Sequence, residues 1–199
     1  MLTVKKNAGF TVIELLTALF VLAVAVSLAV PSFRQMIQNN RMASQINLVT
    51  SLVSFARSEA AKRPNVVITT CPSADLATCA ASANWEQGWV IFVDIDGDRV
   101  VDAGDGDAVL YTAGPISGGN TLRVSGLTNT NYVQFFGNGE PVPPSLGAGA
   151  SGTFTLCDSR GAEVSRNVVV MESGQTRLAR DTNGDGIPNN HAGNNVSCP

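Results

Sequence analysis

One carboxylate, Glu14, lies near the start of the only long apolar run in the chain. The run extends from Phe10 to Val30, and Glu14 is the one charged residue among its 21 positions. About 20 helical residues cross the ~30 Å hydrocarbon core of a bilayer, so the run has the length of a membrane-spanning helix. A carboxylate there costs about 2.5–3.5 kcal/mol and by default marks a site that needs a partner. The partner that we favour is a backbone amine, because opposite charges attract strongly in a low dielectric.

Two other interpretations of this segment stay open. Glu14 lies only four residues after Phe10, so its side chain could reach the membrane interface instead of a partner. The run could also be a cleaved secretory signal. Against that, it is longer than a typical signal core of about 7–15 residues. It also carries an acid, and Pro31-Ser32-Phe33 follows where small residues are expected.

A second group of residues has the spacing of a calcium loop. Acidic oxygen ligands lie at positions 1, 3, 5, 9 and 12 of a 12-residue segment, as in EF-hand-like loops: Asp94, Asp96, Asp98, Asp102 and Asp105. Two residues depart from the pattern. Arg99 stands where a turn glycine is expected, and position 12 is Asp instead of Glu. The alternative is a hairpin turn rich in Asp and Gly.

A third stretch, residues 181–189, resembles thrombospondin-type calcium repeats. Its candidate ligands are Asp181, Asn183 and Asp185. The stretch has the expected glycine but lacks an acid at position 12. Here too, an Asx-rich turn is the alternative.

The residues after the apolar run predict a helical spine. Residues 31–63 contain no glycine, and their only proline is Pro31. Apolar residues recur at spacings of three and four, which is typical of an amphipathic helix: Ile46, Val49, Leu52, Val53, Ala56 and Ala60. The polar side is predicted to carry Gln45, Asn47, Ser51, Ser54, Arg57 and Ser58. Pro31 is expected to bend or locally open the helix, and Pro64 to end it.

After Pro64 the sequence changes to short strand signals separated by Gly, Asn, Asp and Pro. We expect eight strands, and a long loop over 137–151: Val66–Thr70, Gly88–Asp94, Ala108–Thr112, Thr121–Ser125, Tyr132–Phe136, Gly152–Cys157, Asn167–Met171 and Gln175–Ala179. The predicted fold class is therefore α+β, with a long N-terminal helix packed on an antiparallel sheet. The predicted regions are a leader (1–9), a transmembrane helix (10–30), an amphipathic spine (31–63) and a β-rich head (64–199).

Export is predicted from the charges that flank the apolar run. Lys5 and Lys6 precede it without any acid, which keeps the N-terminus cytoplasmic and places the head outside the cytoplasm. Four cysteines in an exported domain suggest two disulfides. Proximity favours Cys71–Cys79 and Cys157–Cys198, although the sequence allows three connectivities. A zinc site is disfavoured, because no C-x-x-C pair is present and His191 is the only histidine.

The segment Gly9-Phe10-Thr11-Val12-Ile13-Glu14-Leu15-Leu16 resembles the cleavage and N-methylation motif of type IV pilins and type II secretion pseudopilins. Further stretches are similar to the FimT/GspH group of minor pilins: Ala56–Ala60, Cys71-Pro72-Ser73, Trp85-x-x-Gly88-Trp89 with Phe92-Val93-Asp94, and Ser173–Arg177. The resemblance weakens in residues 113–150 and after Arg180. It implies a prepilin peptidase that cuts between Gly9 and Phe10 and methylates the new amine. It also implies that Glu14 pairs with the terminal amine of a neighbouring subunit.

The same resemblance implies a structural protein with other pilins or pseudopilins and an inner-membrane assembly platform as partners. Its location would be the inner membrane, with a single span and a periplasmic head, and then the filament. We expect a type IV pilus minor pilin, and a GspH-like pseudopilin of type II secretion is the alternative. An enzyme is the rival class, but His191 lies in a Gly/Asn-rich tail with no nucleophile pattern around it.

DNA is a further candidate partner, because some FimT-type pilins are associated with DNA capture through basic residues near the C-terminal end. The matching segment here offers Arg177, with Arg180 close by and Arg160 and Arg166 as flanking candidates. After Val30 the chain has 11 basic and 15 acidic residues. A general basic surface is therefore excluded, and only a local patch could bind phosphates.

Overall fold

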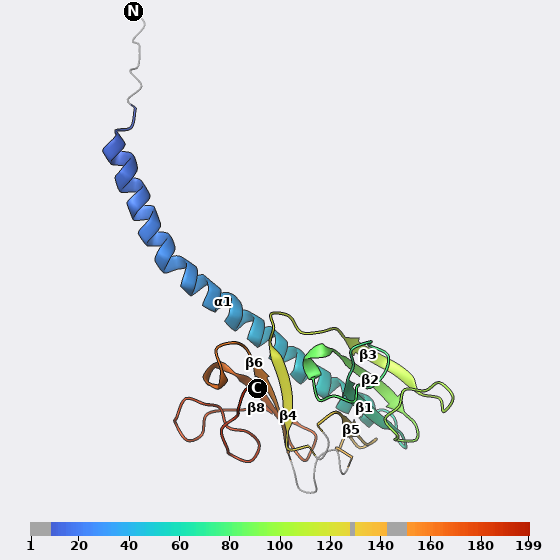
Figure 1. Cartoon of the computed structure of the whole chain (residues 1–199). Helices are drawn as coiled ribbons and strands as arrows, with labels where there is room; N and C mark the ends of the chain where they lie inside the picture. The colour runs from blue at the N-terminus through green and yellow to red at the C-terminus, as the bar shows by residue number, and fades with distance from the viewer. Residues whose placement is uncertain (1–8, 128–129, 143–150) are drawn as a thin grey trace, which may run out of the picture. The chain divides into compact units, whose positions relative to one another are not determined.

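The computed structural model describes residues 9–127, 130–142 and 151–199. One helix, α1 (Val12–Ala61), precedes eight strands and two short 3-10 helices, η1 (Trp85–Gln87) and η2 (Ala162–Val164) (Figure 1). The chain divides into two compact units, residues 1–41 and 42–199, with the boundary inside α1. The predicted leader, apart from Gly9, and most of the predicted loop 137–151 lie outside the described residues.

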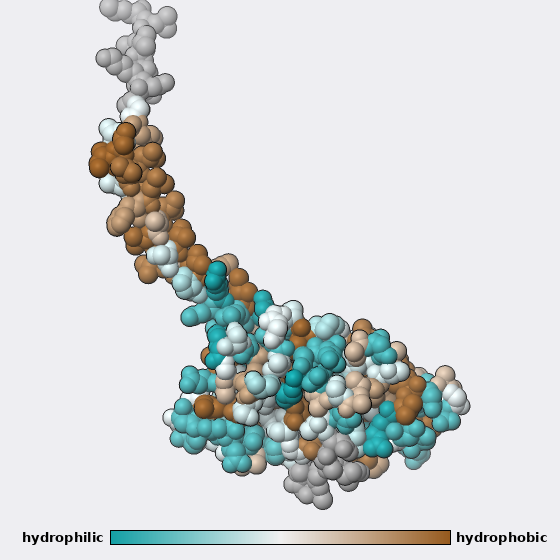
Figure 2. Space-filling model, viewed as in Figure 1, coloured by the Kyte–Doolittle hydropathy of each residue, from teal (hydrophilic) through white to brown (hydrophobic). Residues whose placement is uncertain are grey.

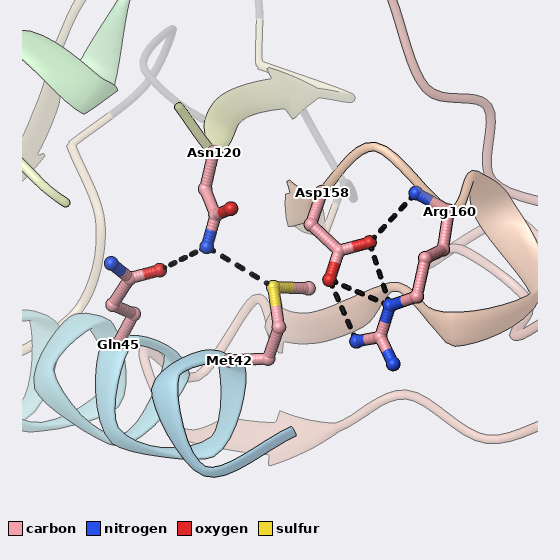
Figure 3. Close-up of polar contacts among 5 residues, drawn as sticks. All are labelled: Met42, Gln45, Asn120, Asp158 and Arg160. Atoms are coloured by element: carbon pink, nitrogen blue, oxygen red, sulfur yellow. Dashed lines mark hydrogen bonds and ion pairs between the residues drawn. The ribbon is translucent and has the colours of Figure 1, made fainter. Parts of the chain in front are cut away.

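The second half of α1 is amphipathic, as its spacing predicts. All six expected apolar positions are buried, from Ile46 to Ala60, and Met42 joins them. Gln45 was expected on the polar side and is instead buried. Both polar atoms of its side-chain amide are hydrogen-bonded, because Gln45 Oε1 accepts a hydrogen bond from Asn120 Nδ2 at 2.6 Å and its Nε2 donates to Ser117 O at 2.8 Å. Figure 3 shows Asn120 reaching down to both Gln45 and Met42.

The ends of α1 differ slightly from the expected ones. The helix continues through Pro31 without interruption and ends at Ala61, three residues before Pro64. Near this end, Glu59 forms ion pairs with Lys62 and Arg63. The hydrogen bonds from Lys62 and then Arg63 lower the pKa of Glu59.

All eight predicted strands are present, with ends shifted by at most two residues. They are β1 (Val67–Pro72), β2 (Trp89–Asp94), β3 (Ala108–Ala113), β4 (Thr121–Ser125), β5 (Val133–Phe135), β6 (Gly152–Cys157), β7 (Arg166–Val170) and β8 (Thr176–Leu178). Every pairing between them is antiparallel. They form two four-stranded sheets, with strand orders β3-β2-β1-β5 and β4-β6-β7-β8. The predicted antiparallel α+β fold is confirmed, but the strands divide into two sheets instead of one, because β5 pairs with β1 and β4 pairs with β6.

One apolar core joins the second half of α1 to both sheets. It contains Ile68 and Ile91 from the first sheet and Leu122 and Val168 from the second, all fully buried. An aromatic cluster lies in the same core. Trp85 packs edge-on against Trp89 and Phe154, with ring centroids 5.1 Å apart in both pairs. Both tryptophans are therefore part of the packed interior and not a ligand platform.

Two disulfides close loops of very different length. Cys71 is bonded to Cys79 across 8 residues, and Cys157 is bonded to Cys198 across 41. These are the pairs that proximity in the sequence favoured. The second bridge ties the C-terminal tail to the end of β6, at the centre of the second sheet.

Candidate functional site

The first candidate site is the short segment before α1. Gly9, Phe10 and Thr11 precede the helix, and both Gly9 and Phe10 are exposed. A Cβ atom at Gly9 would meet nothing within 4 Å. The bond between Gly9 and Phe10 therefore lies outside helical structure and is accessible to another protein.

Glu14 lies in the first turn of α1, where the helix dipole favours a negative charge. Thr11 Oγ1 accepts a hydrogen bond from the backbone N–H of Glu14 at 3.2 Å, and Thr11 O accepts one from the N–H of Leu15 at 3.1 Å. Thr11 therefore caps the helix. The sequence signal for this role is the T-x-x-E spacing of a capping box, which the sequence analysis missed.

The segment that follows is apolar on all sides. Residues 9–37 are all exposed, and the strongest 18-residue window in α1 has a mean hydropathy of 2.5. Figure 2 shows that hydrophobic side chains dominate the visible face of the first half of the helix. By length and composition this part of α1 is able to cross a membrane. A helix that is hydrophobic all round is typical of a membrane span or of a partner-covered segment.

The first acidic loop brings together three of its five candidate ligands. Carboxylate oxygens of Asp94, Asp96 and Asp98 lie within 4.8 Å of one another. Asp102 and Asp105 are not part of this cluster among the described residues. Partial desolvation, and then the charge of Asp105, raises the pKa of Asp102.

Asp94 differs from its neighbours because it is fully buried and already hydrogen-bonded. Its Oδ1 accepts from the N–H of Gly97 at 2.8 Å, and its Oδ2 accepts from Gln134 Nε2 at 3.1 Å and from the N–H of Arg99 at 3.2 Å. Thr69 donates a further bond to Oδ2. Asp94 therefore organises the turn whether or not a cation is bound.

Arg99 occupies the position at which a calcium loop has glycine. Its φ is +71°, so the chain keeps the left-handed conformation that glycine would give it. The Arg99 guanidinium lies 4.9 Å from the centre of the Tyr132 ring and donates to Tyr132 Oη at 3.0 Å. These contacts hold the side chain and offset the cost of the backbone conformation.

In the second candidate loop, the acidic side chains cap their own turn. Asp181 accepts hydrogen bonds from the N–H groups of Asn183, Gly184 and Gly186, which lower its pKa. Asp185 accepts from Asn195 Nδ2 at 2.5 Å and from Asn183 Nδ2 at 2.9 Å, and its pKa is also lowered. The loop is therefore stabilised by Asx turns.

The four arginines considered for phosphate binding are not equivalent. Arg177 lies on β8 and Arg180 follows it, and both are exposed without an ion pair in the described part of the chain. Arg166 is exposed at the start of β7. Arg160 is instead neutralised by Asp158, because its Nη2 and Nε donate to Oδ2 at 2.6 and 2.9 Å (Figure 3). Arg160 therefore drops out of the candidate patch.

His191 has a structural contact that the sequence did not reveal. Thr153 Oγ1 accepts the backbone N–H of His191 at 2.8 Å and lies 3.0 Å from its Nδ1. The hydroxyl proton is then available to Nδ1, which favours the neutral imidazole. Partial burial lowers the pKa of His191. A Cβ at Gly126 would come within 2.3 Å of the ring, so only glycine fits beside it.

Two family models match the chain. One, described as type II transport protein GspH, matches residues 45–174, and the other, the prokaryotic N-terminal methylation motif, matches residues 4–30. Among solved structures, the chain is similar to the type IV minor pilin FimU of Pseudomonas aeruginosa strain PAO1. In one crystal form the TM-score is 0.53 at 20% identity, covering 73% of this chain and 92% of that chain. In a second form the TM-score is 0.50 at the same identity, covering 69% and 92%. No curated protein matches the sequence.

Proposed function

Because the chain belongs to the GspH family of type IV pilin-like proteins, we propose that it is a structural minor subunit of a type IV pilus. The observation that carries the proposal is the N-terminal segment. It combines an exposed Gly9–Phe10 bond with an acid in the first helical turn. The N-methylation motif covers the same residues.

In this proposal, the chain begins as a precursor in the inner membrane. The first half of α1 spans the bilayer once, and the head lies in the periplasm. A prepilin peptidase hydrolyses the bond between Gly9 and Phe10 and methylates the new amine of Phe10. Thr11 stays in place after cleavage and continues to cap the helix.

Glu14 then pairs with the terminal amine of a neighbouring subunit. Each charge alone is expensive to keep in a hydrocarbon environment, and the pair offsets both costs. Assembly at the inner-membrane platform therefore favours transfer from the lipid to the filament. The all-round apolar surface of the first helix half supports packing against other pilin helices.

A pseudopilin of a type II secretion system is the second candidate. The description of the matched family model names type II transport, which favours it. The similarity to FimU shows the fold alone. Deleting the gene distinguishes the two roles, since a pilus subunit affects piliation and a pseudopilin affects the secretion of folded proteins.

DNA uptake has weaker support. Arg177 and Arg180 are exposed at and just after β8, with Arg166 exposed at the start of the neighbouring β7, but the chain has a net charge of −3. A mobility shift at low salt that weakens in the Arg177→Ala, Arg180→Ala double variant would support DNA binding. The absence of a mobility shift at low salt would exclude DNA binding.

The decisive experiment compares Glu14→Ala with a matched control, Glu163→Ala, which removes an exposed acid from the head. Each variant is expressed at native level in cells with the assembly machinery. Mass spectrometry of the mature N-terminus should show methylated Phe10 in both. We expect Glu14→Ala to remain in the membrane and to be lost from sheared filaments, while Glu163→Ala enters them normally. Normal incorporation of Glu14→Ala, or a mature chain that still carries Met1, contradicts the proposal.

A further inference from the structure

The four edge strands of the two sheets differ in what covers them. The edges are β3 and β5 in one sheet, and β4 and β8 in the other. At β5, the N–H of Val142 donates to Gln134 O at 2.9 Å, and residues 140–142 occupy the edge. At β4, the N–H of Leu122 donates to Glu86 Oε2 at 3.3 Å. The edge of β5 is therefore covered by the chain itself, and the edge of β4 is contacted at Leu122.

The outer edge of β8 is open. Its bonds to β7 use alternate residues, since the N–H of Met171 donates to Gln175 O at 2.8 Å and the N–H of Ala179 donates to Asn167 O at 2.9 Å. The backbone groups of Thr176 and Leu178 consequently point away from β7. The described residues provide no partner for them, and Leu178 is 55% exposed. Unpaired strand groups of this kind are a template for another strand.

The outer edge of β3 is open in the same way. The N–H of Ser73 donates to Gly88 O at 2.8 Å, so Gly88 and every second residue after it in β2 direct their backbone groups toward β1. The residues between them, Trp89 and Ile91, direct theirs toward β3. Thr112 on β3 therefore turns its backbone groups outward, and a register shift between Ile91 and Phe92 interrupts the alternation at Leu110. The strand is exposed along most of its length, and Tyr111 is 44% exposed.

The two open edges have opposite charge. β8 carries Arg177 and is followed by Arg180, and neither forms an ion pair in the described part of the chain. β3 follows the loop 95–107, which contains five acids and one base, Arg99. Arg99 is held against Tyr132 and offsets only one of these five negative charges. A basic edge and an acidic edge on one chain are complementary between copies.

A small cavity beside β8 adds a second basic feature. It has a volume of about 310 Å³ and lies between α1 and the turn before β8, with Ser54, Arg57, Ser58, Gly174, Gln175 and Thr176 around it. The hydrogen bond of Arg57 uses Nε, which donates to Gly139 O at 3.1 Å. Its Nη atoms have no acceptor among the described residues and could bind an acidic side chain from a strand added at β8.

From these observations we infer that the open β8 edge of one copy pairs with the open β3 edge of a second copy. Backbone hydrogen bonds join β8, at Thr176 and Leu178, to β3 around Thr112, and the arginines face the partner's loop 95–107. The contact is heterologous, so each pair leaves one β3 and one β8 free, and the interaction can repeat along an assembly. Because the strands are short, it needs the high local concentration of a membrane or filament.

The test uses two differently tagged copies of the full chain in the same membrane. One carries Leu178→Cys and the other Thr112→Cys. All four natural cysteines are disulfide-bonded, so each copy has one free thiol. A short bifunctional maleimide, which tolerates an offset in register, should link the two tags. Controls pair Leu178→Cys with itself and with Ala192→Cys, an exposed position on neither edge. We expect several-fold less product from both controls.

Charge reversal then tests the specific partner. Arg177→Glu on the Leu178→Cys copy should reduce the product several-fold, and Asp105→Arg on the Thr112→Cys copy should restore it. The inference is overturned if the controls give as much linked product as the test pair. It is also overturned if charge reversal neither reduces nor restores the product, or if added DNA abolishes the product. These outcomes are separate from the proposed function, because filament entry through Glu14 is measured independently.

Discussion

The hydroxyl of Thr69 donates a hydrogen bond to Oδ2 of Asp94, and both side chains are fully buried. Gln134 Nε2 donates to both of them, at 3.0 Å to Thr69 and 3.1 Å to Asp94. Three neighbouring strands, β1, β2 and β5, therefore share one polar network at the base of the acidic loop. A buried carboxylate of this kind is stabilising only while its partners are present.

Removing the Asp94 carboxylate should destabilise the head even when calcium is absent. Asp94→Ala leaves the Thr69 hydroxyl and two backbone N–H groups without this acceptor and removes one of the hydrogen bonds of Gln134, so we expect the free energy of unfolding to fall by about 2–3 kcal/mol. The control Asp96→Ala removes an exposed acid whose one hydrogen bond from a described residue comes from the N–H of Asp98, at 3.2 Å. Its effect should be below about 0.5 kcal/mol. Urea unfolding of the detergent-solubilised chain measures both, and equal losses would contradict this role.

The calcium hypothesis for loop 94–105 makes a separate prediction. Bound calcium stabilises the folded state by mass action, so the melting temperature should rise in millimolar calcium and not in magnesium. The Asp96→Asn, Asp98→Asn double variant keeps the Asp94 network and should lose the calcium response. Its melting temperature without calcium should be unchanged or higher, because like charges are removed. A wild-type chain that shows neither heat of binding nor a shift excludes the site.

His191 should make stability depend on pH in a defined direction. Burial lowers its pKa in the folded state below 6.5, the value expected when unfolded. The unfolded chain therefore binds more protons between these two pKa values, and stability falls as the pH drops below 6.5. His191→Gln should remove this decline over the range from about pH 7 to pH 5. Parallel curves for the two proteins over that range would contradict the assignment.

The Cys157–Cys198 bridge should hold the tail in place. In the chain-entropy model, closing a loop of 41 residues stabilises the fold by about 4 kcal/mol, and closing 8 residues by about 2–3 kcal/mol. The Cys157→Ser, Cys198→Ser variant should accordingly expose residues after Arg180 to limited proteolysis, whereas Cys71→Ser, Cys79→Ser should leave that tail protected. Mass spectrometry of the fragments distinguishes these outcomes, and an uncut tail in the first variant would be the contrary result.

Much of the architecture could be predicted because its signals are local. The spacing of Ile46, Val49, Leu52 and Val53 identifies the buried face of α1, since a helix repeats every 3.6 residues. β4 and β6 have their predicted bounds, because turn residues flank both. The motif around Gly9 and Glu14 was equally visible, because it consists of consecutive residues.

Contacts between distant residues could not be predicted in the same way. The sequence pattern predicted Gln45 to lie on the surface. In the structure it is hydrogen-bonded to Asn120, which lies in the segment before β4 and 75 positions later in the sequence. Arg160 looked like a free cation until a tight turn placed Asp158 against it. In both cases one polar side chain decides whether another is buried, paired or available, and a linear pattern does not contain that choice.

The sequence alone predicted the order of helix and strands along the chain, favoured the two cysteine pairs, and identified the acid four residues after Phe10. All of these depend on composition and short spacings along one chain. Tertiary structure decided that the strands divide into two sheets, that the Asp94 carboxylate is buried in a polar network, and that β3 and β8 are edge strands without a further strand partner among the described residues. Strand pairing is set by which surfaces can be buried together, and that is a property of the whole folded head.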